Sequence, residues 1–109
     1  MSHPLGPLAH NMTAYAIYAT AQAEMRRAYA LIDAGNYLGA AEEIDSAARA
    51  AEVLVIASEG VDEGRAEHWR RVVHARRRFA ERARGRGRGT RVPGGGVCGS
   101  PPTARGRGR

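Results

Sequence analysis

The fold of this 109-residue chain is decided by residues 28–50, which read AYALIDAGNYLGAAEEIDSAARA. Gly35 follows a helical pattern and suits the residue that ends a helix, because glycine tolerates the left-handed backbone that closes a helix C-terminus. Asn36 suits the N-cap of a following helix, since its side chain accepts a hydrogen bond from the next turn. The break spans only two or three residues, so the segment predicts two antiparallel helices joined by a tight turn.

Helical periodicity extends from this turn in both directions. Before it, apolar residues recur at three- and four-residue steps over residues 9–34; they are Ala14, Ile17, Tyr18, Ala21, Met25, Ala28 and Ile32. After it, a second stripe over residues 37–58 contains Tyr37, Ala40, Ala41, Ile44, Ala47, Ala48, Ala51 and Val55. Alanine dominates both stripes, which favours helix formation and lets two helix axes approach closely. We therefore expect a hairpin of two helices, 9–34 and 37–58.

The rest of the chain adds one more helix and two ends. Residues 1–8 contain Pro4, Gly6 and Pro7, which predict an irregular lead-in. Gly60 and Gly64 mark a second break, and the apolar pattern beyond it predicts a third helix over residues 61–84. Residues 85–109 are rich in Arg, Gly and Pro and lack apolar periodicity, which predicts a disordered tail. The expected fold is an all-α three-helix bundle over residues 9–84, built on the antiparallel hairpin and followed by that Arg/Gly-rich C-terminal tail.

The hairpin resembles a single tetratricopeptide repeat unit over residues 28–50. The residues that carry the resemblance are Ala28 and Leu31 before the turn, Gly35-Asn36-Tyr37 at the turn, and Ala40, Ile44 and Ala47 after it. That family places small residues where its two helices cross and an aromatic residue after the turn. The resemblance implies a tightly packed helical hairpin and, as a function, peptide binding. No second repeat follows, whereas stacked arrays of this family contain three or more.

Charge divides the chain into an acidic front and a basic back. Every one of the 17 basic residues is Arg, and the formal net charge is +6. Residues 1–64 hold three arginines and nine acidic residues, whereas residues 65–109 hold fourteen arginines and two acidic residues. Such asymmetry is typical of a basic segment that meets an anionic partner.

The arginines of the third helix and the tail are therefore candidate phosphate contacts for DNA or RNA, because arginine binds phosphate without reading sequence. The candidates are Arg70, Arg71, Arg77, Arg78, Arg82, Arg84, Arg86, Arg88 and Arg91. The alternative is intramolecular, since a three-helix fold places the acidic second helix beside the basic third helix and exposed ion pairs form between them. The residues concerned are Glu42, Asp45 and Glu52 on the second helix and Arg70, Arg71 and Arg77 on the third.

Aromatic residues supply the candidates for protein contact. The first helix is apolar on more than one side, which is typical of a partner surface or a self-association surface. The candidate contact residues are Tyr15, Tyr18, Tyr29 and Tyr37. Trp69 is interpreted as a core anchor between helices. Arg65 and Arg76 interrupt the apolar arc of the third helix, and we expect their stems to lie on the core with the guanidinium groups directed outward.

No pattern in the sequence points to catalysis, so we expect no catalytic, cofactor-binding or metal-binding residues. His68 and His74 are six residues apart and fall on different faces of a helix. Paired cysteines and the His-Glu-x-x-His pattern of zinc sites are missing from the sequence. The single cysteine, Cys98, excludes an internal disulfide and favours a cytoplasmic location. The sequence also contains no apolar run that predicts a membrane span and no signal-peptide pattern.

Two functions remain as hypotheses. The first is a small non-enzymatic α-helical protein-interaction module that binds another protein or self-associates through its first helix. The alternative is a nucleic-acid-binding or regulatory protein that contacts DNA or RNA phosphates non-specifically through the Arg-rich third helix and tail. Neither hypothesis requires a membrane, a cofactor or a small-molecule substrate.

Overall fold

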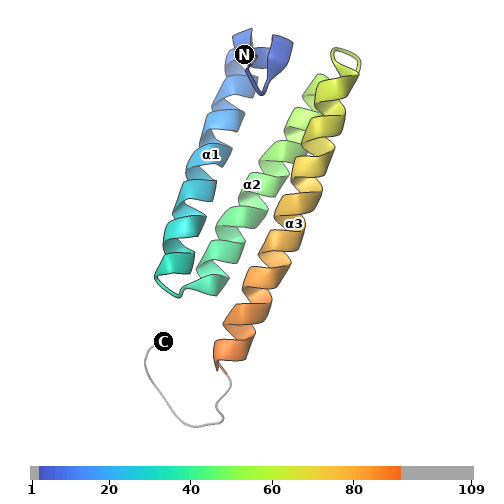
Figure 1. Cartoon of the computed structure of the whole chain (residues 1–109). Coiled ribbons are helices and arrows are strands. Elements are labelled where there is room, and N and C mark those ends of the chain that lie inside the picture. Colours follow the sequence, from blue (N-terminus) through green and yellow to red (C-terminus); the bar gives the residue numbers. More distant parts are fainter. Residues whose placement is uncertain (1–2, 92–109) are drawn as a thin grey trace.

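The structure, a computed structural model, describes residues 3–91 of the chain. Its elements in order are the short 3-10 helix η1 (Gly6–His10) and three α-helices, α1 (Met12–Asp33), α2 (Tyr37–Ser58) and α3 (Glu63–Arg91). Consecutive α-helices run antiparallel and lie side by side along their length (Figure 1). The all-α three-helix bundle built on a helical hairpin is therefore confirmed.

The turn between α1 and α2 uses the two residues that the sequence singled out. Gly35 adopts a positive φ of 82°, the conformation in which glycine alone avoids a steric penalty. The Asn36 side chain accepts a hydrogen bond from the backbone N–H of Gly39 at 2.9 Å and caps α2. Asn11 caps α1 in the same way, with the N–H of Ala14 at 3.0 Å. Local chemistry thus defines where both helices of the hairpin begin.

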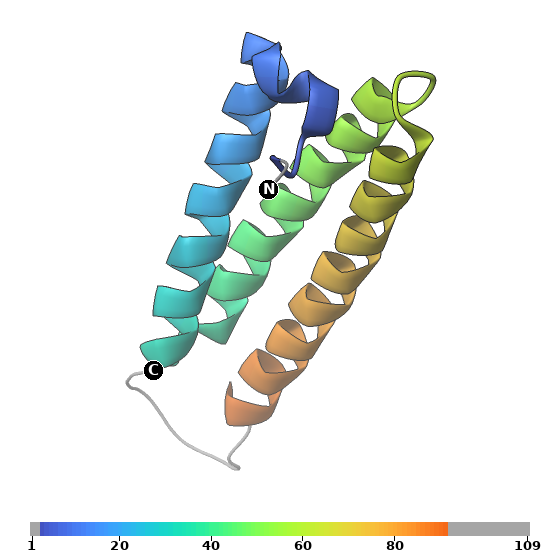
Figure 2. The same ribbon diagram turned by 45° about the horizontal axis from the view of Figure 1, so that its top comes forward.

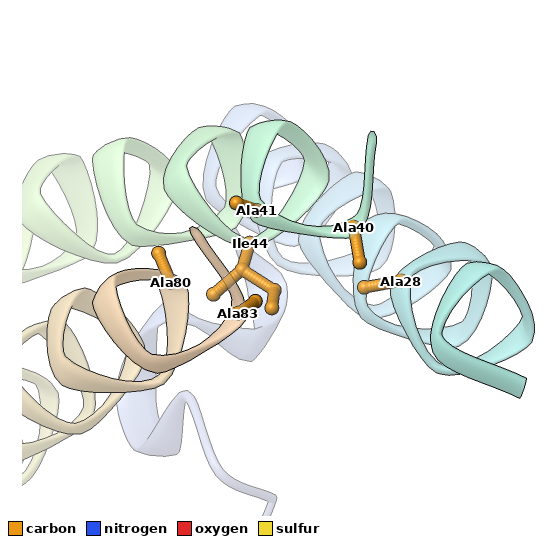
Figure 3. Packing of buried hydrophobic residues seen from close by; sticks show 6 residues of the cluster. All are labelled: Ala28, Ala40, Ala41, Ile44, Ala80 and Ala83. Carbon is orange, nitrogen blue, oxygen red and sulfur yellow. The ribbon is translucent and has the colours of Figure 1, made fainter. Parts of the chain in front are cut away.

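The central helix of the bundle is α2, which packs closely on both α1 and α3 (Figure 2). Five of its eight buried residues are alanines, so the neighbouring helix axes come close to it. Ile44 is the largest side chain at one end of this core and is fully buried. It lies against Ala80 and Ala83 of α3, while Ala40 faces Ala28 of α1 (Figure 3). The predicted alanine stripe of the second helix is therefore the core of the protein.

The other end of the core includes Leu5 from the lead-in (residues 1–8), which was predicted to be irregular. Leu5 is fully buried and packs with Leu54 and Trp69. The chain around it turns into η1, and the guanidinium of Arg65 donates a hydrogen bond to the carbonyl of Pro4 at 3.4 Å. Trp69 is 3% exposed, which confirms its interpretation as a core anchor. The prolines of the lead-in are compatible with this arrangement because a 3-10 helix tolerates proline in its first turn.

The third helix continues seven residues beyond the predicted end at residue 84. It reaches Arg91 because residues 85–88 still have a neighbour in the first turn of α2. Gly87 is buried there beneath Leu38, and Arg86 donates a hydrogen bond to the hydroxyl of Tyr37 at 2.9 Å. The expected disordered tail over residues 85–109 is thus wrong for residues 85–91, and its remaining residues, 92–109, lie outside the described residues.

Candidate functional site

Three of the arginines proposed as phosphate contacts are occupied by carboxylates of the protein itself. Arg77 pairs with Glu52 at 2.9 Å and with Asp45 at 3.3 Å, and Arg84 pairs with Asp45 at 2.6 Å. Arg70 binds Glu59 and Glu67, each at 3.0 Å. The hydrogen bonds that Arg70, Arg77 and Arg84 donate to Glu59, Glu52 and Asp45 respectively raise the pKa of each arginine. Asp45 and Glu52 therefore act as the intramolecular alternative predicted, and Glu42 makes no ion pair within residues 3–91.

The remaining candidate arginines have weaker partners or none in the described part of the chain. Arg71 lies 3.7 Å from Glu67. Arg82 stands over the ring of Phe79, with 5.6 Å between the guanidinium carbon and the ring centre, and Arg86 lies over Tyr37 at 4.4 Å. Arg78 and Arg88 are exposed and make no ion pair with residues 3–91. The side chain of Arg91 lies outside the described part.

The four tyrosines proposed for protein contact do not form one surface. Tyr15 and Tyr18 lie together near the start of α1, with ring centres 6.2 Å apart, and Tyr18 packs edge-on against Trp69 at 6.1 Å. Tyr29 lies further along α1, with its ring 5.8 Å from that of Phe79. Tyr37 is on α2, beneath Arg86. Of the three tyrosines on α1, Tyr18 and Tyr29 are the two whose rings contact aromatic rings of α3.

Between these two contacts, along the length of the helices, lies a groove between α1 and α3. Since both helices pack on α2, their side chains meet while their backbones stay apart, and a hollow of about 440 Å³ remains. Its lining comes from Gln22, Met25, Arg26 and Tyr29 of α1 and from Val72, Ala75, Arg76 and Phe79 of α3. We refer to this hollow as the α1–α3 groove. Tyr29 is 55% exposed at its rim.

Arg76 carries the only half-buried positive charge in the α1–α3 groove. Its guanidinium donates hydrogen bonds to the backbone carbonyl of Ala47 at 2.9 Å and to the side-chain oxygen of Gln22 at 3.5 Å. Within residues 3–91 it has no carboxylate partner, and burial lowers its pKa. The prediction that this group points away from the core is therefore wrong, because the small alanines of α2 leave a backbone carbonyl within its reach.

Two further grooves differ from this one in their charges. The groove between α1 and α2, of about 390 Å³, contains both Glu24 and Arg49. The groove between α2 and α3, also about 390 Å³, contains both Glu52 and Arg70. Among these three hollows, the α1–α3 groove alone is lined by arginines without a carboxylate. It combines an apolar lining with uncompensated positive charge.

Other kinds of site are not found in residues 3–91. No three side chains of the His, Cys, Asp or Glu type come together there as metal ligands. None of the helices in that range has both the length and the apolar composition needed to cross a bilayer. Comparison of the chain with protein families, with curated proteins and with solved structures finds no match.

Proposed function

We propose that the protein is a non-enzymatic α-helical interaction module that binds a helix of a partner protein in the α1–α3 groove. The observation that carries this proposal is the incomplete packing of α1 and α3. Both helices lie on the same central helix, run parallel to each other and leave an apolar groove between them. In an antiparallel four-helix bundle a fourth helix occupies this position. The cytoplasmic location favoured by the single cysteine belongs to the same proposal.

The dimensions of the groove suit a short helical segment. The contacts of Tyr18 and Tyr29 with α3 are eleven residues apart, which corresponds to about 16 Å along the helix. An amphipathic helix that binds through residues i, i+3 or i+4, and i+7 needs about 10 Å for its anchors. Half-buried Met25, Val72 and Phe79 offer apolar surface for such anchors.

Affinity purification with matched groove variants tests the proposal. The full chain is tagged and incubated with lysate of its own cells, with and without nuclease, and bound proteins are identified by mass spectrometry. Ala75→Trp fills the α1–α3 groove, and Ala16→Trp fills the α1–α2 groove as a control; both alanines are exposed. We expect a nuclease-resistant partner that Ala75→Trp loses and Ala16→Trp retains. Recovery of the same proteins by both variants contradicts the proposal.

Self-association is the competing use of the apolar surface of α1. Met12 is 87% exposed and Tyr15 is 47% exposed on this helix, outside the groove, and a second copy that packs on α1 would cover them. Light scattering over a range of protein concentrations distinguishes the two cases. A monomer at all concentrations favours a separate partner, whereas a dimer that Ala75→Trp dissociates shows that a second copy fills the groove.

Nucleic-acid binding is the second candidate function, and one surface of α3 favours it. Arg71, Arg78 and Arg82 are spaced by seven and four residues, which places them on one exposed face of the helix. Arg78 has no carboxylate partner within the described part of the chain, and Arg71 has only a distant one. Electrophoretic shift assays at increasing salt test this function with the wild type and with the three arginines changed to Gln. A lack of binding at low salt contradicts it.

A further inference from the structure

Resting on the function proposed above, we infer that the partner of the α1–α3 groove is an acidic amphipathic helix, one carboxylate of which pairs with Arg76. The inference concerns the chemistry of the partner, which follows from the charges of the groove. Arg76 and Arg26 line the hollow together with apolar side chains, and no acidic side chain lines it.

The described residues supply Arg76 with two hydrogen-bond acceptors, and neither is charged. A guanidinium has five N–H donors in a fixed plane, and the two hydrogen bonds of Arg76 go to neutral oxygens, the second of them at 3.5 Å. Arg77, the next residue, binds two carboxylates instead. Burying a cation without a counter-charge is unfavourable, and a carboxylate that binds both terminal nitrogens would remove that penalty.

The nearest acidic side chain on α1 is already engaged on another face. Glu24 accepts a hydrogen bond from the hydroxyl of Ser46 on α2 and lines the α1–α2 groove. Its charge raises the pKa of Arg76 only as a minor influence beside burial. Tyr18 and Tyr29 exert the other coulombic influences on Arg76, and neither of them is a carboxylate. Within residues 3–91 Arg76 therefore has no carboxylate partner, and the inferred helix supplies one.

The chemistry of the groove disfavours the other occupants. A second copy would bring its own α1 and α3, so that Arg26 and Arg76 of one copy would meet those of the other. A nucleic acid would place a highly charged backbone against Met25, Val72 and Phe79, whereas the exposed arginine face of α3 lies outside the groove. An acidic amphipathic helix satisfies both parts of the lining, since its apolar side covers the hydrophobic residues and its carboxylates meet the arginines.

A helical peptide library displayed on phage identifies the preferred chemistry directly. The library varies the apolar anchor positions and offers Glu, Gln and Lys in equal proportion at the flanking positions. Selection uses the full chain as target at physiological ionic strength. We expect binders enriched in Glu beside the anchors and competing with one another for one site. Binders with equal Glu and Gln at these positions overturn the inference and leave the proposed function in place.

Variants then assign the selectivity to Arg76. Changing the central Glu of a selected peptide to Gln is expected to weaken binding to the wild type by about tenfold or more. The same change should have less than about a threefold effect on Arg76→Met. Arg49→Met, which removes a guanidinium from the α1–α2 groove, should retain the full effect. If Arg49→Met loses the selectivity as Arg76→Met does, general attraction to a basic protein explains it, and the inference fails.

A second pair of variants covers the case in which Arg76→Met disturbs the fold. Ala75→Glu places a carboxylate beside Arg76 at an exposed position, and Ala75→Gln is its neutral match. We expect Ala75→Glu to weaken the acidic peptide about tenfold more than Ala75→Gln does, with unchanged circular dichroism for both. Equal effects of the two variants overturn the inference. If no selected peptide loses binding in the Ala75→Trp variant, the proposed function itself is overturned.

Discussion

The extension of α3 to Arg91 predicts opposite effects for two glycine-to-alanine substitutions that lie two residues apart. Gly85 is exposed on the helix, and an added Cβ atom would have no neighbour within 4 Å. Gly87 is buried, and its added Cβ atom would lie 2.8 Å from two carbons of the Leu38 side chain. Any Gly→Ala change inside a helix gains about 1 kcal/mol from helix propensity, less near a fraying end. Both variants therefore gain helix propensity, but only Gly87→Ala creates a close contact with Leu38.

The expected free energies follow from these two contributions. Gly85→Ala should increase the free energy of unfolding by about 0.5–1 kcal/mol. Gly87→Ala has the same gain but displaces Leu38, and overpacking of this kind costs about 1–3 kcal/mol. We expect Gly87→Ala to be as stable as the wild type or less stable, and less stable than Gly85→Ala by about 1–3 kcal/mol. In a domain of this size that difference corresponds to about 4–24 °C in Tm.

Far-UV circular dichroism during thermal and urea unfolding measures both quantities. The double variant Leu38→Ala/Gly87→Ala is the control, because removing the Leu38 side chain makes room for the new methyl group. In a double-mutant cycle, Leu38→Ala and Gly87→Ala together should destabilise the protein by less than the sum of their separate effects. Equal stabilities of the Gly85→Ala and Gly87→Ala variants would refute the reasoning, since they would mean that residues 85–88 do not pack on α2.

Three further substitutions test the core and the ion pairs by urea unfolding. Ile44→Ala should lower the free energy of unfolding by about 2–5 kcal/mol, because Ile44 is fully buried among alanines that cannot fill the cavity; a loss below 1 kcal/mol would contradict this packing. Asp45→Asn removes the carboxylate that two arginines of α3 share. It should lower the free energy of unfolding by about 1 kcal/mol at low salt and by less at high salt. The control Glu42→Gln, at an exposed position, should leave the free energy of unfolding unchanged. Ser58→Ala removes a buried hydroxyl that has no hydrogen-bond partner within residues 3–91 and should stabilise the protein by up to about 1 kcal/mol. A clear loss of stability would show that this hydroxyl forms a hydrogen bond.

The hairpin could be predicted from the sequence because its determinants are local. Gly35 and Asn36 define the turn through their own backbone and side-chain chemistry. The alanine stripe repeats at helical spacing and has no competing pattern. The ends of the bundle could not be predicted in the same way. Leu5 becomes part of the core by packing in one cluster with Leu54 and Trp69, which are far away in the sequence.

The candidate site depends on distances between helices, which the sequence pattern does not contain. The composition of the third helix predicted a basic surface, but it did not show which arginines find carboxylates. Arg70, Arg77 and Arg84 recur every seven residues and therefore share one face of α3. The acidic residues of the second helix indicated the partners of Arg77 and Arg84, whereas Arg70 pairs with Glu59 after that helix and with Glu67 on α3 itself. The signal for Arg76 was weaker, since an arginine within an apolar arc does not reveal which neighbouring backbone its guanidinium reaches.

Arg76 and Arg77 show how position on a helix assigns different roles to one residue type. Adjacent residues on a helix are separated by about 100°, which turns Arg77 toward the carboxylates of α2 and Arg76 toward the α1–α3 groove. Arg77 therefore helps to hold α3 on the acidic helix α2, and its charge is neutralised within the protein. Arg76 keeps a net positive charge in an apolar setting, where an external carboxylate gains the most from pairing. A net charge of +6 describes neither situation. What matters for recognition is Arg76, the half-buried arginine of the α1–α3 groove that has no carboxylate partner within residues 3–91.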